Sequence, residues 1–155
     1  EPGVEWVGAL DGERRDELQA RYLNASLFLC PSRFEPFGVA ILEAMSAGCP
    51  AVALDRGAAR EIIEDGVTGS LLRDDEPSAL AKVILGWTSD LERLSAAGAR
   101  AKATVQERWG WDRAARRVEQ GLLSGGIGPL LKPQGTRVRR QPVPGERPAR
   151  AARMR

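Results

Sequence analysis

The sequence feature that most constrains the fold is an apolar run that leads through a turn into a helical pattern. Residues 26–30 (SLFLC) form a short apolar run of the kind that makes a buried parallel strand. Apolar side chains then recur at the helical spacing at Val39, Leu42 and Met45. Gly38 lies at the start of this predicted helix. The order of strand, turn and helix is typical of α/β folds built on a parallel sheet.

Two glutamates lie on this turn and helix. Glu35 precedes Gly38, and Glu43 follows about two turns later, where its side chain can lean back toward the helix start. The first amides of a helix have no backbone partner and carry partial positive charge, so a phosphate can bind them. Each carboxylate can accept hydrogen bonds from two hydroxyls. The segment therefore predicts a site for a ligand with both phosphate and hydroxyl groups, such as a nucleotide sugar.

The alternative is that both glutamates are ordinary surface charges, which is the usual situation for this residue type. Their position favours a binding site instead. The preceding strand and the apolar helix face place them at the carboxyl end of a sheet, where open α/β folds bind ligands.

The rest of the chain alternates between strands and helices. We predict strands at residues 4–7, 51–54 and 70–72, and helices at residues 13–25, 38–47, 59–64, 78–87, 91–107 and 112–123. This alternation predicts a Rossmann-like parallel sheet with right-handed crossovers, followed by a helical end. A length of 155 residues suits one domain.

Residues 31–45 (PSRFEPFGVAILEAM) resemble the donor-binding signature of the group 1 family of retaining glycosyltransferases with the GT-B fold. In that signature two glutamates separated by seven residues flank Phe-Gly. The resemblance continues through residues 42–53 (LEAMSAGCPAVA) and 57–72 (GAAREIIEDGVTGSLL) and covers roughly residues 4–123. The chain departs mildly from the pattern, with Ala58 where the family usually has Gly and Arg60 where it often has Pro.

The resemblance implies a role for each matching residue. Glu35 would hold hydroxyls of the transferred sugar and be the catalytic residue, and Glu43 would bind the nucleotide ribose. The amides around Phe37, Gly38 and Val39 would bind the sugar and the distal phosphate. Catalysis would then consist mainly of positioning and of electrostatic stabilisation of the departing nucleoside diphosphate. The partners would be a nucleotide-sugar donor and an unknown sugar acceptor, with no cofactor. The chain has no histidine and no clustered cysteines, so no metal ion is expected.

The same resemblance implies that the chain is a truncated carboxyl-terminal domain. Residues 4–7 would be its third strand, so that the first two strands and the acceptor-binding amino-terminal domain would precede Glu1. We expect residues 26–30 to form an edge strand that either pairs directly with residues 4–7 or leaves them detached, with a tendency to self-associate. The full-length protein would be a hexosyltransferase-like enzyme, and this fragment alone would be inactive.

Two other functions stay open. The first is a related GT-B epimerase or phosphorylase, against which the match around residues 35–38 argues. The second is a non-catalytic nucleotide-binding or interaction module with a basic tail. The upstream coding sequence would separate these interpretations.

The carboxyl-terminal segment has a different composition. Residues 130–155 carry eight Lys or Arg, one Glu and four Pro. We therefore expect a partial nucleotide-sugar-binding domain at residues 1–124 and a disordered Pro/Arg-rich tail at residues 125–155. The tail's charge could attract RNA, an anionic membrane surface or an acidic partner. The favoured interpretation is a solvated tail or linker, because no aromatic residues lie among the arginines to stack on bases, and nucleic acid is not expected.

Three smaller expectations complete the sequence analysis. No signal peptide or membrane-spanning run is visible, so we expect a cytoplasmic protein. Cys30 and Cys49 lie at opposite ends of neighbouring parallel strands, too far apart for a disulfide. The segment with Trp109 and Trp111 should anchor the last helix to the core rather than bind sugar.

Overall fold

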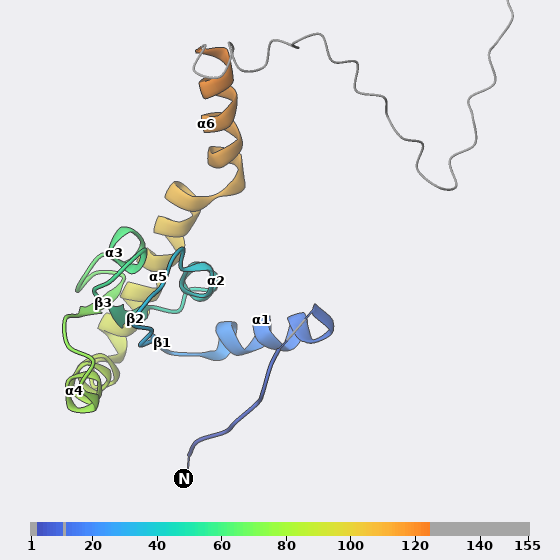
Figure 1. The fold of residues 1–155 in the computed structure, drawn as a ribbon. Coiled ribbons are helices and arrows are strands. Elements are labelled where there is room, and N and C mark those ends of the chain that lie inside the picture. The colour runs from blue at the N-terminus through green and yellow to red at the C-terminus, as the bar shows by residue number, and fades with distance from the viewer. Residues whose placement is uncertain (1–2, 11, 125–155) are drawn as a thin grey trace, which may run out of the picture. The chain divides into compact units, whose positions relative to one another are not determined.

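The computed structural model describes residues 3–10 and 12–124. Its elements are η1 (Gly12–Arg14), α1 (Arg15–Asn24), β1 (Phe28–Cys30), α2 (Val39–Ser46), β2 (Ala51–Leu54), α3 (Ala59–Ile62), β3 (Gly69–Leu72), α4 (Pro77–Thr88), α5 (Leu91–Trp109) and α6 (Trp111–Leu123) (Figure 1). The chain divides into two units, residues 1–117 and 118–155, and everything below concerns the first unit except the end of α6. The predicted tail at residues 125–155 lies outside the described residues.

The sheet has three parallel strands in the order β1-β2-β3. Phe28 is the register partner of Ala51, and Ala51 is in turn the partner of Gly69. All four residues of β2 are buried. A central strand that is covered on both faces needs a continuous apolar run, and the β2 sequence AVAL supplies one. The predicted parallel α/β architecture is confirmed.

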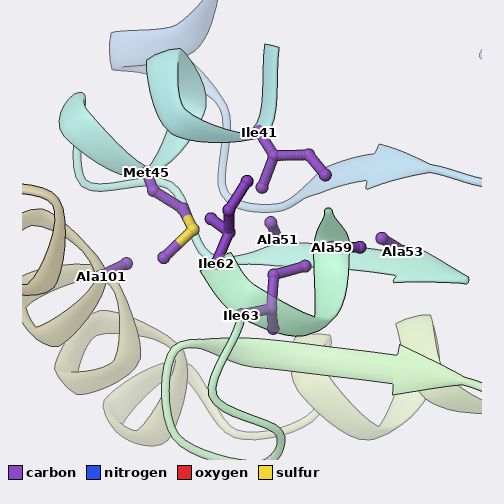
Figure 2. Close-up of a cluster of buried hydrophobic side chains, with 8 residues drawn as sticks. All are labelled: Ile41, Met45, Ala51, Ala53, Ala59, Ile62, Ile63 and Ala101. Atoms are coloured by element: carbon purple, nitrogen blue, oxygen red, sulfur yellow. The ribbon is translucent and has the colours of Figure 1, made fainter. Parts of the chain in front are cut away.

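The two faces of β2 build two clusters of buried side chains. Ala51 and Ala53 point to one face, where they pack against side chains from α2, α3 and α5, as Figure 2 shows. The full set on this face is Ile41, Met45, Ala51, Ala53, Ala59, Ile62, Ile63 and Ala101. Val52 and Leu54 point to the other face and pack against Leu72, Trp87, Leu94 and Ala97. Alternate residues of a strand face opposite sides, so four residues are enough to join both layers.

The predicted strand at residues 4–7 is wrong. These residues form no strand, and Val4 and Trp6 are 72% and 93% exposed. A strand is stable only when a neighbour pairs with its backbone, and among the described residues β1 pairs with β2 alone. The expected edge position of β1 is therefore confirmed, and of the two expected arrangements the chain takes the detached one. An ion pair of 3.2 Å between Glu5 and Arg21 attaches this segment to α1 instead.

The predicted helices all form, with shifted ends. The helix predicted to end at residue 64 stops at Ile62, because Ile63 is extended and the Glu64 amide donates to the Thr68 hydroxyl at 2.9 Å. Trp109 packs against the core cluster at the end of α5, as expected. Trp111 is 90% exposed, so the anchoring interpretation is wrong for that residue.

Cys30 and Cys49 are both free thiols, as predicted. Burial raises the pKa of the Cys49 thiol to about 11.

Across residues 3–10 and 12–124, no helix has both the length and the apolar character needed to cross a membrane.

Candidate functional site

The backbone of Glu35 is fixed by the turn that follows β2. The Ala58 amide donates to the Glu35 carbonyl oxygen at 2.9 Å. Gly57 has a φ of 57°, and a side chain there would collide with the same carbonyl oxygen. Only glycine combines that backbone conformation with so close an approach. The turn after β2 therefore holds the turn after β1 in place.

The Glu35 side chain reaches the start of α2. Its Oε1 accepts a hydrogen bond from the Gly38 amide at 2.8 Å, and its Oε2 accepts one from the Cys30 thiol at 3.8 Å. The carboxylate is half-buried. A carboxylate at a helix start is stabilised by the amides and by the helix dipole. The structure therefore brings Glu35 and Gly38 together. The Gly38 amide, which was predicted to bind the donor, donates its hydrogen bond to Glu35.

Gly38 allows the chain to enter the helix at this point. Its φ is 83°, a conformation that L side chains rarely adopt, and a side chain there would meet the end of Ile62. The first backbone hydrogen bond of α2 runs from the Leu42 amide to the Gly38 oxygen at 3.0 Å. The amides of residues 39–41 precede that bond and have no helical carbonyl to which they can donate. Val39 is the first of them.

Glu43 lies one turn into α2 with an exposed side chain. Its Oε2 accepts a hydrogen bond from the Tyr22 hydroxyl at 3.5 Å. Burial of Tyr22, and secondarily the Glu43 carboxylate, raise the pKa of the Tyr22 phenol. Glu43 thus lies in α2 and Glu35 lies in the loop before it. Within the described part of the chain, the two carboxylates share no hydrogen-bond partner.

Phe37 and Val39 expose their side chains, by 59% and 54% respectively. The Phe37 ring meets the Trp109 ring edge to face, with the centroids 6.5 Å apart. The sequence prediction assigned these two residues a role through their backbone amides rather than their side chains. Sequence reasoning missed the contribution of Trp109 to this loop.

Sequence reasoning also missed Tyr22 and the support from Gly57. The sequence analysis assigned Tyr22 no role at the site. No local pattern could have found it, because its partner Glu43 lies on another helix. For Gly57 the signal was the resemblance itself, since the family places glycine there.

Ionic contacts join the loops at the carboxyl edge of the sheet. Arg33, after β1, pairs with Asp75, after β3, at 2.7 Å, and this hydrogen bond lowers the pKa of Asp75. Arg60 pairs with Asp55 after β2. In the parts of the chain that the structure describes, no group of three His, Cys, Asp or Glu side chains could hold a metal ion.

The candidate site residues do not line the hollow found on this part of the chain. A hollow of about 410 Å³ lies at the junction of α5 and α6 and is lined by Gln106, Glu107, Gly110, Trp111, Asp112, Arg113 and Arg116. None of the residues predicted to bind the donor contributes to it. The start of α2 combines backbone amides, a group that can bind an anion, with the Glu35 carboxylate, a group that can accept hydrogen bonds from hydroxyls.

Comparison with protein families identifies the class to which this fold and site belong. Residues 2–104 match the family model described as Glycosyl transferases group 1. The match covers more than half of the chain, and the chain therefore belongs to the group 1 glycosyltransferase family. The predicted family is confirmed.

Curated relatives agree with this assignment. The sucrose synthase of Denitrovibrio acetiphilus is 36% identical over 121 residues, which cover 74% of this chain and 15% of that protein. The D-inositol 3-phosphate glycosyltransferase of Streptomyces avermitilis is 37% identical over 101 residues, which cover 65% of this chain and 22% of that protein. The chain thus spans less than a quarter of the length of these two relatives.

A solved structure shows the same fold. The crystal structure of Anabaena Alr3699/HepE in complex with UDP-glucose superimposes with a TM-score of 0.65 at 29% identity, over 70% of this chain and 30% of that one. The α/β fold is therefore that of part of a GT-B glycosyltransferase, as predicted.

Proposed function

We propose that this chain is the donor-binding part of a retaining glycosyltransferase that transfers a sugar from a nucleoside-diphosphate sugar to an acceptor. The observation that carries the proposal is the Glu35 carboxylate held at the start of α2 by the Gly38 amide at 2.8 Å. It places a hydroxyl acceptor beside amides that can bind phosphate. The similarity to a structure determined with UDP-glucose supports the choice of ligand class.

Each predicted residue has a role in this proposal. Glu35 accepts hydrogen bonds from hydroxyls of the transferred sugar and is the catalytic residue. The amides around Phe37, Gly38 and Val39 bind the sugar and the distal phosphate, and Glu43 accepts hydrogen bonds from the ribose hydroxyls. As the bond to the sugar breaks, negative charge grows on the leaving diphosphate, and the start of α2 stabilises that charge. The proposal includes neither a cofactor nor a metal ion.

We also propose that the active enzyme is longer than this chain. The two relatives above extend far beyond the matched region. An acceptor-binding domain would complete the site, the transferred sugar would be a hexose, and the chain alone would have no transferase activity. The location that we propose for the enzyme is the cytoplasm, where nucleotide sugars would reach the open sheet edge.

The test is a comparison of Glu35→Gln and Glu43→Gln. In the protein that carries this chain, Glu35→Gln should lower kcat more than it weakens donor binding. Glu43→Gln should mainly raise the donor dissociation constant, by about ten- to a hundredfold, because a hydrogen bond to a charged group is worth about 1.5 to 3 kcal/mol. Uridine, guanosine and adenosine diphosphate sugars would be screened by calorimetry and by turnover.

Glu92→Gln is the matched control, since Glu92 is exposed on α5. It should leave both kcat and the dissociation constant unchanged. Wild-type values for both site variants would contradict the assignment of the two glutamates. Sugar transfer by the 155-residue chain alone would contradict the proposal that a further domain is needed.

A further inference from the structure

Tyr22 joins three elements of the site. It lies near the end of α1, and its ring meets the Phe28 ring of β1 edge to face, with centroids 5.7 Å apart and an angle of 73° between the planes. Its hydroxyl donates to Glu43 Oε2 in α2 at 3.5 Å. The ring is half-buried although α1 has no fully buried residue. The phenol is therefore fixed by its ring contact and directed at the Glu43 carboxylate.

The two glutamates of the site are held in different ways. Glu35 is held by the Gly38 amide at the start of α2 and by the Cys30 thiol at the end of β1. Within the described residues, the Tyr22 hydroxyl is the one group that donates a hydrogen bond to the Glu43 carboxylate. A long exposed side chain loses rotamer freedom when a ligand orders it, and a partner that already restricts it reduces that loss.

We propose that Tyr22 is a positioning residue that orients the Glu43 carboxylate toward the hydroxyls of a nucleotide ribose. The inference rests on the proposed function, in which Glu43 binds that ribose. Tyr22 engages Oε2, which leaves Oε1 and further acceptor positions on both oxygens for the ligand. A tyrosine hydroxyl is protonated at neutral pH and can therefore donate this hydrogen bond.

The length of the contact fits a positioning role. Hydroxyl to carboxylate hydrogen bonds are usually about 2.5 to 3.0 Å long, and this one measures 3.5 Å. Hydrogen bonds at functional sites often shorten when the ligand binds. Glu43 can therefore shift slightly to meet a ribose without losing its partner.

The test is a double-mutant cycle on nucleotide binding to the full chain. Tyr22→Phe keeps the ring and its packing on Phe28 and removes the hydroxyl alone. It should raise the dissociation constant of the nucleoside diphosphate about three- to tenfold, as loss of a single hydrogen bond does. In the Glu43→Gln background the same change should have much less effect, because the carboxylate that it orients is gone. The probes are UDP, GDP and ADP, measured by calorimetry.

A second readout separates positioning from a purely structural role. The effect of Tyr22→Phe should disappear when the probe is the 2′,3′-dideoxy form of the same nucleotide, which has no ribose hydroxyls for Glu43. The melting temperature should stay within about a degree of wild type. A structural role would lower the melting temperature and weaken both forms of the nucleotide equally.

Each outcome decides the inference. If Glu43→Gln weakens binding and Tyr22→Phe does not, the positioning role is wrong and the proposed function stands. If the two changes add fully in the double variant, Tyr22 acts independently of Glu43 and the inference is overturned. If Glu43→Gln has no effect on binding, or the chain binds none of the probes, the role proposed for Glu43 fails and the inference falls with it.

Discussion

β1 and β2 are neighbours in one sheet, but their surroundings differ. All four residues of β2 are buried, and helices pack on both faces. In β1, Leu29 is 38% exposed, and the preceding helix α1 has no buried residue. The hydrophobic stabilisation of the described chain is therefore concentrated around β2, in one cluster on each of its faces.

The candidate site lies across the boundary between these two regions. Glu35 and Gly38 are fixed from the β2 side, by Gly57, Ala58 and Ile62. Glu43 depends instead on Tyr22, which belongs to the β1 side. This difference indicates that the Glu35 end of the proposed site is held more rigidly than the Glu43 end.

The largest expected effect comes from removing a core side chain. Ile62 is 1% exposed and packs within the cluster of Figure 2. Ile62→Ala should lower the free energy of unfolding by about 2 to 5 kcal/mol, because it leaves a cavity. Trp6 is 93% exposed and precedes α1 on the β1 side, so Trp6→Ala should change the free energy of unfolding by less than about 0.5 kcal/mol. Urea denaturation measures both, and equal losses would contradict the comparison.

Alanine substitutions at two glycines in helices should have smaller and opposite effects on stability. In α5, a methyl group on Gly98 would collide with the Gly48 carbonyl oxygen, whereas at Gly86 in α4 it would meet nothing within 4 Å. Gly98→Ala should therefore destabilise the fold by about 1 to 3 kcal/mol. Gly86→Ala should stabilise it by about 0.5 to 1 kcal/mol, because alanine favours the helix. Thermal unfolding of the two variants gives the signs, and a stable Gly98→Ala protein would show that α5 does not pack tightly on the turn after α2.

The smallest expected effect concerns the two cysteines. The folded state holds the pKa of Cys49 at about 11, above its ordinary value of 9.0. The stabilisation is complete below about pH 9 and is lost as the pH rises toward 11, because the unfolded thiol ionises first. Between pH 7 and pH 10 the loss should be about 1 kcal/mol.

The loss is measured as the change in the stability difference between wild type and Cys49→Ala over that pH range. A thiol reagent should also modify Cys30 in the native protein and leave Cys49 untouched. Rapid native labelling of Cys49 would contradict its burial.

Sequence patterns predicted the β2 side, β1 and α1, and they failed for the segment before α1. Residues 51–54 and the helix after Gly38 were predictable, because apolar period and a glycine at a helix start are local signals. Residues 4–7 have a strand-like pattern, but whether a strand forms depends on a pairing partner, which no local pattern reports. The residues Glu35, Gly38 and Glu43 could be selected from their spacing and the family resemblance. The contact of Tyr22 with Glu43 could not, because it joins residues on different helices.

The most direct test of the central claim is to locate the nucleoside diphosphate on the chain by nuclear magnetic resonance. A chain of 16.8 kDa is small enough for amide spectra to be recorded during titration with UDP, GDP and ADP. We predict that the largest shifts occur at the amides of Gly38 and Val39, where the diphosphate competes with Glu35 for the Gly38 amide. Gly66, which precedes β3 at the opposite edge of the sheet, should be unaffected. Shifts centred on Gly66, or none at Gly38 under saturating nucleotide, would contradict the donor site proposed here.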